Sequence, residues 1–255
     1  MLKRTLTSAA VAAALAFAAA PASAEFMDFK VDETSVPGVP VDAPIFTADK
    51  LNGGYEELVS ITGANSFAAQ AFATFTSFRA NEATSTVESF AGAPNSVGGY
   101  SLYAVFSATG TFVGSSFTGV TGAFTLYIDP DKNTTATLTD GIVAPTLAGT
   151  GDDYEIASTS SLVNGTGSLS GPPGAFDFIF KDFELTDAGK LYFVHPNPFY
   201  IRTQVNGDID QFSTTSPFFV TGDVSAVFVP EPGTLALAGL ALGAMGFVTR
   251  RRRAA

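Results

Sequence analysis

Short segments in which apolar and polar residues alternate run through most of this 255-residue chain. Phe176–Lys181 places three phenylalanines on one face, and Phe124–Ile128 alternates in the same way before Asp129-Pro130. Glycine-containing turn signals such as Asn206-Gly207 recur between these segments. A period of two puts the apolar side chains of a strand on one face, while the turns reverse the chain. The pattern therefore predicts an all-β fold of antiparallel strands.

Further strands are expected at Tyr55–Ile61, Tyr100–Phe106, Leu191–Val194, Phe199–Val205 and Phe218–Val229. The segment Phe67–Phe78 has phenylalanines three residues apart, as on a helix face, but its β-branched neighbours favour a strand. Residues 25–45 are Pro-rich and are expected to form a peripheral strand or lead-in. Several short strands at this spacing indicate an antiparallel β-sandwich or jelly roll, which we expect over residues 25–229.

The composition limits how such a domain can be stabilised. The chain has no cysteine and no tryptophan, but it has 24 phenylalanines. Without cysteine there is no disulfide, no thiol catalysis and no Cys-based metal site. We therefore expect a core of phenylalanine and small aliphatic side chains. The lack of tryptophan makes a carbohydrate module less favoured, although seven tyrosines keep that interpretation open.

The first 24 residues have the pattern of a secretory signal peptide. Lys3 and Arg4 form a positive start, and Val11–Ala20 is an apolar, alanine-rich core. Small residues at Ala22 and Ala24 then form a cleavage site. We expect the segment 1–24 to be removed, so that the mature chain begins at Glu25.

The last 26 residues combine three features in a fixed order. Pro230, Glu231 and Pro232 precede the apolar run Leu235–Val248, and a cluster of four arginines follows: Arg250, Arg251, Arg252 and Arg253. A 14-residue helix spans roughly 21 Å, whereas the hydrocarbon core of a bilayer is about 30 Å thick. The predicted transmembrane helix, residues 235–249, therefore suits temporary retention in the inner membrane. Clustered positive charge remains cytoplasmic, which places the preceding domain on the opposite side.

This tail resembles that of PEP-CTERM proteins of Gram-negative bacteria. In that family, a Pro-Glu-Pro motif, a short transmembrane helix and a terminal arginine cluster form a signal read by an exosortase, a membrane protease-transpeptidase. Here residues 230–232 match the motif and residues 250–253 match the basic end, so residues 230–255 are interpreted as a sorting tail. The resemblance implies an exosortase as partner, with cleavage near the motif. The alternative is an ordinary C-terminal anchor with a Pro-containing stalk.

A second resemblance extends over most of the domain, to the flocculation-associated branch of the same family. The segments that carry it are Phe29–Gly38, Phe46–Glu57, Asp129-Pro130 and Pro198-Phe199-Tyr200. Proteins of that branch are linked to holding cells in a polysaccharide matrix. The resemblance implies a role at the cell surface or in the exopolysaccharide matrix of flocs or biofilms, and it assigns no catalytic residue.

The domain between the two signals is strongly acidic. Six of the 13 basic residues and one of the 24 acidic residues lie in the terminal segments, which leaves 7 basic and 23 acidic residues and a formal charge of −16 over residues 25–229. Such a surface repels phosphate groups, so nucleic acid is excluded as a partner class. It favours solubility, and divalent cations could bridge it to other anions.

One loop has a spacing typical of calcium binding. Asp129, Asp131, Asn133 and Asp140 occupy the first, third, fifth and twelfth positions of one stretch. Calcium loops place oxygen ligands at these positions. The sixth residue, however, is Thr134 instead of glycine, and strands are expected to flank the stretch. The other interpretation, an Asp-Pro turn between two strands, is the one that we favour. Apart from this calcium site, no cofactor is predicted.

Signals for catalysis are weak. His195 is the only histidine, and no nucleophile-elbow pattern accompanies it. Carboxylate pairs such as Glu56-Glu57 and Asp152-Asp153 would need the separation that a glycosidase requires, which sequence does not give. We expect no catalytic residue and interpret the chain as an exported, non-enzymatic surface or matrix protein. The alternatives are a carbohydrate- or calcium-binding module, and a polysaccharide-active enzyme with two carboxylates facing each other in a cleft.

Overall fold

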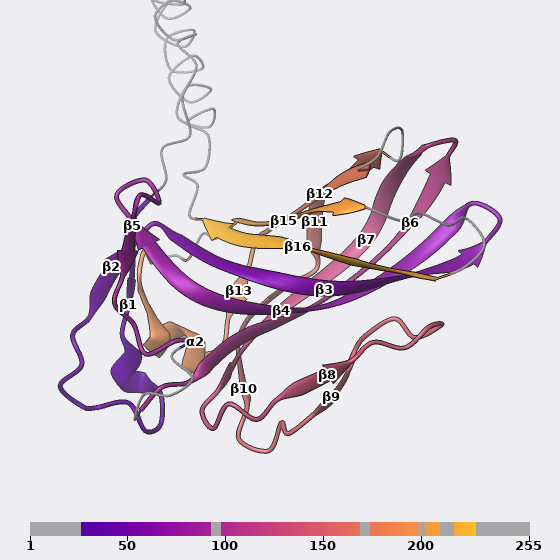
Figure 1. Ribbon diagram of the computed structural model, residues 1–255. Helices are drawn as coiled ribbons and strands as arrows, with labels where there is room; N and C mark the ends of the chain where they lie inside the picture. Colours follow the sequence, from indigo (N-terminus) through magenta and orange to yellow (C-terminus); the bar gives the residue numbers. More distant parts are fainter. Residues whose placement is uncertain are drawn as a thin grey trace, which may run out of the picture. The chain divides into compact units, whose positions relative to one another are not determined.

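The computed structural model describes residues 27–92, 98–168, 174–197, 199, 202–209 and 217–227 (Figure 1). All of them belong to one compact unit, which runs from Phe26 to Val229. The signal peptide, residues 1–24, and the sorting tail, residues 230–255 with its helix 235–249, lie outside the described residues. They stay predictions from the sequence. In the part of the chain that is described, no helix combines the length and apolar character needed to cross a membrane.

The main sheet of the described residues has eleven strands, of which eight antiparallel ones form the wall of a barrel and follow one another in space in the order in which they occur in the chain. They are β3 (Lys50–Gly63), β4 (Ser66–Ala80), β6 (Ser101–Val113), β7 (Ser116–Asp129), β11 (Ser161–Ser168), β12 (Gly174–Lys181), β15 (Arg202–Ile209) and β16 (Phe218–Val227). The first and last are also neighbours, because β16 pairs with β3 from Phe218↔Val59 to Val227↔Lys50. The sheet is therefore a closed barrel (Figure 1).

The expected all-β class is confirmed, but the expectation of a sandwich or jelly roll is wrong. A sandwich needs two separate sheets packed face to face, whereas here one sheet closes on itself. Closure depends on an interrupted strand after β7. Strand β10 (Tyr154–Thr159) pairs with one half of β7 and β11 with the other half, through Thr166↔Thr118 and its neighbours. Short strand β13 (Glu184–Leu185) extends the sheet beside β10.

Phenylalanine rings fill the barrel. Phe176, Phe178 and Phe180 all point inward from β12, as the alternation predicts. The Phe106 ring lies 5.8 Å from those of both Phe178 and Phe180, measured between ring centroids. Phe117 on β7 contacts Phe178 at 6.3 Å. Because such rings pack edge to face or offset, a single connected core joins strands that are far apart in sequence.

Small residues on the facing strands make room for these rings. A Cβ atom added to Gly167 on β11 would lie 1.9 Å from the ring of Phe117, closer than two atoms can approach. Alanines contribute the inward side chains of β4 at positions 69, 71 and 73, and all three are buried. The small inward side chains thus leave space for the large rings, so that the interior is closely packed.

A small cap lies at one end of the barrel (Figure 1). It contains a three-stranded sheet, the 3₁₀ turn η1 (Glu33–Ser35) and helix α2 (Asp187–Tyr192), with short strand β5 (Ser85–Val87) paired to β4 nearby. The sheet has the order β14 (Phe193–His195), β1 (Phe29–Val31), β2 (Phe46–Ala48). Strand β1 is the peripheral strand expected in residues 25–45.

Buried hydrogen bonds join this cap to the barrel. The Glu33 carboxylate is 2% exposed and accepts hydrogen bonds from the backbone N–H of Phe90 and from the hydroxyls of Ser89 and Tyr100. The Tyr100 hydroxyl also lies 2.6 Å from that of Tyr192 at the end of α2. A buried charge needs such partners to be tolerated. This network therefore fixes η1, the entry to β6 and α2 relative to one another.

Most expected strands are confirmed, including the ambiguous Phe67–Phe78, which lies within β4. The expectation of a strand at Leu191–Val194 is wrong in its first half, because Leu191 and Tyr192 end helix α2. Thr186 caps that helix by accepting a hydrogen bond from the Gly189 backbone N–H at 3.0 Å. A Cβ atom on Gly189 would lie 1.9 Å from the Ile156 carbonyl oxygen, so glycine lets α2 pack closely against β10.

The connection between β7 and β10 forms a hairpin outside the barrel. Strands β8 (Thr135–Thr137) and β9 (Thr146–Ala148) pair only with each other among the described residues (Figure 1). Its loop is tied to the barrel wall by Gln70, whose side-chain amide donates hydrogen bonds to the carbonyls of Thr139 and Ile142, both at 2.6 Å. The hairpin thus covers part of the outer face of β4.

Replacing a core ring should cost far more stability than replacing an exposed one. Phe178→Ala removes a ring that is 1% exposed inside the barrel, and we expect the free energy of unfolding to fall by about 3–5 kcal/mol. The matched control is Phe219→Ala, because Phe219 is 67% exposed on β16. We expect it to change stability by less than about 0.5 kcal/mol. Chemical denaturation measures both, and equal effects would contradict the described packing.

Candidate functional site

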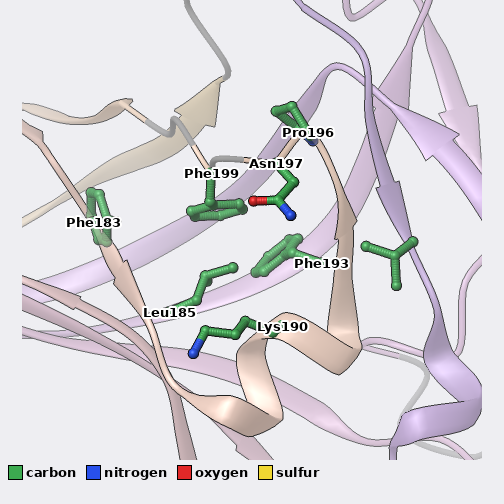
Figure 2. A pocket seen from close by; sticks show the side chains of 8 residues that line it. Phe183, Leu185, Lys190, Phe193, Pro196, Asn197 and Phe199 are labelled. Atoms are coloured by element: carbon green, nitrogen blue, oxygen red, sulfur yellow. The ribbon is translucent and has the colours of Figure 1, made fainter.

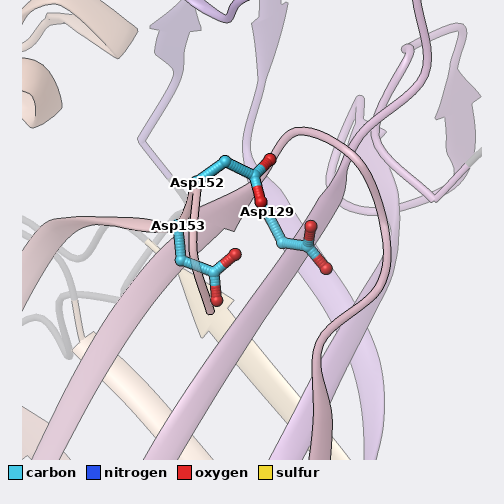
Figure 3. A group of neighbouring side chains, drawn as sticks. All are labelled: Asp129, Asp152 and Asp153. Atoms are coloured by element: carbon cyan, nitrogen blue, oxygen red, sulfur yellow. The ribbon is translucent and has the colours of Figure 1, made fainter. Parts of the chain in front are cut away.

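Three carboxylates from two separate segments converge outside the barrel. Asp129 ends β7, while Asp152 and Asp153 directly precede β10. One carboxylate oxygen from each lies within 4.8 Å of the others (Figure 3). The two segments meet because β7 and β10 pair, with Tyr154 opposite Ile128. We call these three residues the aspartate group.

Neighbouring donors orient the carboxylates of the aspartate group. Asp129 is 1% exposed and accepts hydrogen bonds from the backbone N–H groups of Lys132 and Thr134, at 2.7 and 3.0 Å. One oxygen of Asp153 accepts from the Tyr103 hydroxyl at 2.6 Å and from the Thr134 hydroxyl at 2.6 Å. Its other oxygen is buried without a hydrogen-bond partner in the described structure. Most of these carboxylate oxygens thus have hydrogen-bond donors, but one buried oxygen of Asp153 has none in the described structure.

Negative charge accumulates in this group. Desolvation and the charge of Asp152 raise the pKa of Asp131 above its ordinary value. Burial and the hydrogen bond to Asp153 raise the pKa of the Tyr103 hydroxyl. In both groups desolvation is the first cause, and a neighbouring carboxylate adds to it because a nearby negative charge disfavours a further one. A divalent cation would relieve this repulsion, and oxygen atoms are the ligands that calcium takes.

The structure regroups the residues that the sequence proposed for calcium. Asp129 lies in the aspartate group, whereas the carboxylate of Asp131 accepts a hydrogen bond from the Asn133 side-chain amide at 2.6 Å. Asp140 is followed by Gly141, whose N–H donates to the Ser60 hydroxyl over the barrel wall. Asp140 is described by the structure but does not belong to the aspartate group. Calcium binding stays a prediction, with a different set of ligands.

The spacing within one loop did not select Asp152 and Asp153 as candidate calcium ligands, because they lie more than twenty positions beyond Asp129 in the sequence. A sequence signal for them does exist. Asp129 ends one predicted strand, and Asp152 and Asp153 directly precede Tyr154, where the next long-range strand pairing begins. Antiparallel neighbours bring the end of one strand to the start of the next. Local spacing within one loop could not show this.

Two proposed catalytic arrangements can be placed. Glu56 and Glu57 are adjacent on β3 and therefore lie on opposite faces, with Glu56 exposed and Glu57 buried. They do not face each other as a glycosidase pair. His195 is exposed at the end of β14, opposite Lys30 on β1.

Glu57 differs from the other buried acidic residues. It shares the inward face of β3 with Tyr55 and Val59, and one of its carboxylate oxygens has no hydrogen-bond partner in the part of the chain that is described. Burial raises its pKa from 4.5 to about 8. By contrast, the buried carboxylate of Asp49 accepts hydrogen bonds from the backbone N–H groups of Glu82 and Ala83. Glu57 is thus held as a neutral acid at neutral pH.

An aromatic row crosses the outer face of the barrel. Phe72, Tyr103 and Tyr127 lie on the neighbouring strands β4, β6 and β7, and the two tyrosine rings are stacked at 5.1 Å. Tyr103, at the centre of the row, is only 1% exposed. A sugar-binding platform needs accessible ring faces, so this row does not provide one at Tyr103.

A pocket lies beside the cap, between β13, α2 and β14. It encloses about 360 Å³ (Figure 2). Six apolar and two polar residues line it: Phe183, Leu185, Phe193, Val194, Pro196, Phe199, Lys190 and Asn197. This volume is at the lower end of the ~300–1,000 Å³ that small-molecule sites occupy. Sequence patterns could not predict this pocket, because its lining residues come from a helix, two short strands and a loop. In addition, Phe199 was expected to begin a strand, whereas strand β15 begins at Arg202.

Comparison with known families identifies the tail. Residues 228–253 match the family described as the PEP-CTERM protein-sorting motif. The chain carries a PEP-CTERM sorting domain. The match includes Pro230, Glu231 and Pro232 and the arginines Arg250–Arg253, as the resemblance of the sequence implied. Export and processing by an exosortase follow from the motif. No curated protein and no solved structure matches the chain.

Glu57 should make stability depend on pH. Its pKa is higher in the folded chain than the ordinary value of 4.5, so the folded state binds the proton more tightly. Its contribution to stability is complete below pH 4.5 and is lost as the pH rises through about 8. At about 1.4 kcal/mol per pKa unit, the loss is on the order of several kcal/mol. We expect Glu57→Gln to flatten this slope in denaturation measured between those two pH values.

The control for that experiment is Glu56→Gln, which removes the same charge from the exposed face of the same strand. We expect it to leave the slope unchanged. If both variants have the same pH dependence as the unmodified protein, Glu57 is not the group that titrates.

Calcium should act through the aspartate group. We expect calcium at the ~10⁻³ M at which extracellular calcium modules are filled to raise the midpoint of thermal unfolding. Asp153→Asn should remove this rise, because it takes away the carboxylate with the unpartnered buried oxygen. Asp223→Asn, at an exposed position on β16, is the control and should keep the rise. A melting temperature that calcium does not change would reject the site.

Proposed function

We propose that this PEP-CTERM protein is a non-enzymatic component of the cell surface or extracellular matrix. In this proposal the signal peptide, residues 1–24, directs export, and the sorting tail holds the chain at the inner membrane. An exosortase then cuts near Pro230–Pro232 and releases or transfers the domain outward. The observation that carries the proposal is the sorting motif at residues 228–253.

The physical character of the tail supports a temporary stay in the membrane. Its apolar run of 14 residues is shorter than the roughly 20 residues that a stable spanning helix needs. Proline lacks a backbone N–H and restrains the residue before it to extended geometry, so we expect Pro230 and Pro232 to keep the motif out of the helix. The motif would then be accessible to a membrane protease.

The barrel supports a structural or binding role. Phenylalanine rings occupy its described interior, and the buried carboxylates of Glu33 and Asp49 accept hydrogen bonds that hold segments together. The lone pairs of these two carboxylates accept hydrogen bonds within the fold, so we assign these residues a structural role. We propose that the exported domain works through its outer surface.

The acidic surface supports a place within an exopolysaccharide matrix. With a formal charge of −16 over residues 25–229, the domain stays soluble and attracts cations. Divalent cations could then bridge it to anionic polymers. The flocculation resemblance of Phe29–Gly38 and Phe46–Glu57 favours the same surroundings, so we propose a contribution to flocs or biofilm.

The sorting step can be tested in the producing cell. Deleting the exosortase, or changing Pro230 and Pro232 to alanine, should leave a membrane-retained chain whose intact mass still includes the arginines. The unmodified cell should release or transfer a domain that ends near the motif. Cell fractionation and mass spectrometry measure both. A mature domain that keeps Arg250–Arg253 in unmodified cells would overturn the proposal.

The matrix role needs a separate comparison. Cells lacking this chain should form weaker flocs or biofilm, and the unmodified chain should restore them. A chain with both proline substitutions should not restore them, because it stays at the inner membrane. Normal flocs and biofilm in the deleted strain would reject the matrix role while leaving the sorting step intact.

A further inference from the structure

We propose that the pocket between β13, α2 and β14 binds one pyranose ring of a polysaccharide. It is separate from the sorting motif and from the aspartate group. The inference extends the proposed function, on which it rests for its biological setting, by naming what the exported domain would bind. Its physical basis is the arrangement of apolar and polar groups around the pocket.

The floor of the pocket is aromatic and rigid. Phe193 and Phe183 are buried, at 3% and 6% exposure, and so they are held by the core beneath them. Phe193 packs against Tyr192 at 4.8 Å between ring centroids, and Tyr192 belongs to the buried network of Glu33. Phe199 forms a wall at 4.9 Å from Phe193, tilted by 40°. Phe193 and Phe183 thus form the closed base of the pocket, and the partly exposed ring of Phe199 is the aromatic surface that a ligand can reach.

Two polar side chains stand at the rim. Figure 2 shows the amide of Asn197 next to Phe199 and Phe193, and the amine of Lys190 beyond Leu185 on the other side of the pocket. Both residues are exposed. Asn197 offers a donor and an acceptor, and Lys190 offers donors, one of which is engaged by Asp187 at 2.9 Å. A ligand on the apolar floor would meet hydrogen-bonding groups at two edges.

These features match a pyranose ring. Its C–H groups form a flat apolar face that can lie on the negative face of an aromatic ring. Its hydroxyls project from the edges, where they can reach an amide and an amine. An acyl chain would find the apolar floor but would form no hydrogen bond with Asn197 or Lys190, whereas a sugar would gain these bonds.

The charge around the pocket supports a carbohydrate partner. No aspartate or glutamate lines the pocket, although the domain has 23 acidic residues. Its one charged lining residue is Lys190, a cation. Because Asp187 lies 2.9 Å from the Lys190 amine and balances its charge, the lining favours a neutral sugar and gives an anionic one no unpaired cation. The binding experiment therefore compares a neutral sugar with a uronate-containing one.

The test uses the exported protein purified from its producing cells, so that it does not depend on how sorting occurs. Ligand-observed NMR is recorded with three probes: cellobiose, a glucuronate-containing disaccharide and octanoate. We expect at least one disaccharide to bind with a dissociation constant on the order of 1 mM, typical of a single shallow subsite. Octanoate should bind at least about tenfold more weakly.

Variants locate the binding. Phe199→Ala and Asn197→Ala should each weaken the disaccharide by about tenfold. Phe219→Ala, which removes an exposed phenylalanine from β16, is the matched control and should bind as the unmodified protein does. Asn197 is exposed, so its variant remains informative if Phe199→Ala fails to fold. Circular dichroism and thermal unfolding check that each variant is folded.

Three results would overturn the inference: neither disaccharide binds, octanoate binds more tightly than both, or the pocket variants bind as the control does. Each of them leaves the sorting step untouched, because exosortase processing is read from mass and location. Conversely, disaccharide binding by a domain that keeps its arginines would support the pocket and reject the sorting proposal. The two failures are therefore distinguishable.

Discussion

Closure of the sheet is the constraint on which the described structure depends. With no cysteine in the chain, no disulfide can hold its ends together, so strand pairing and burial must do so. The pairing of β16 with β3 satisfies the backbone groups that would otherwise be free at two sheet edges. Rings such as Phe106 and Phe178 fill the space that closure creates. Closure and packing therefore require each other.

The cap depends on this barrel and in turn builds the pocket. Glu33 is buried where the cap meets the barrel, and its hydrogen bonds to Phe90 and Tyr100 replace the water that it loses. Tyr192 joins the same network and supports Phe193, which forms the floor of the pocket. A polar network within an apolar core is stabilising only when its members are satisfied. The pocket thus inherits its rigidity from a carboxylate that does not line it.

Acidic residues have different roles at the surface of the domain and in its interior. Outside, they give the domain its charge and, in the aspartate group, bring three carboxylates together. Inside, Asp49 accepts backbone hydrogen bonds, while Glu57 is kept neutral by burial among apolar side chains. The surrounding medium decides which form is stable, since a low-polarity interior disfavours the charged carboxylate. Glu56 and Glu57, which are adjacent on β3, therefore differ in role according to the face of the strand that each occupies.

Most of the long strands, the phenylalanine core and the sorting tail could be predicted from the sequence, because each depends on local order: alternation in Phe176–Lys181, or the spacing from Pro230 to Arg253. The closed barrel, the helix at Asp187–Tyr192 and the approach of Asp129 to Asp152 and Asp153 became visible only in the folded chain. These depend on which distant strands pair and on which segments then pack against them. Alternation fixes the face of a side chain on its strand, but it does not fix the neighbour of that strand.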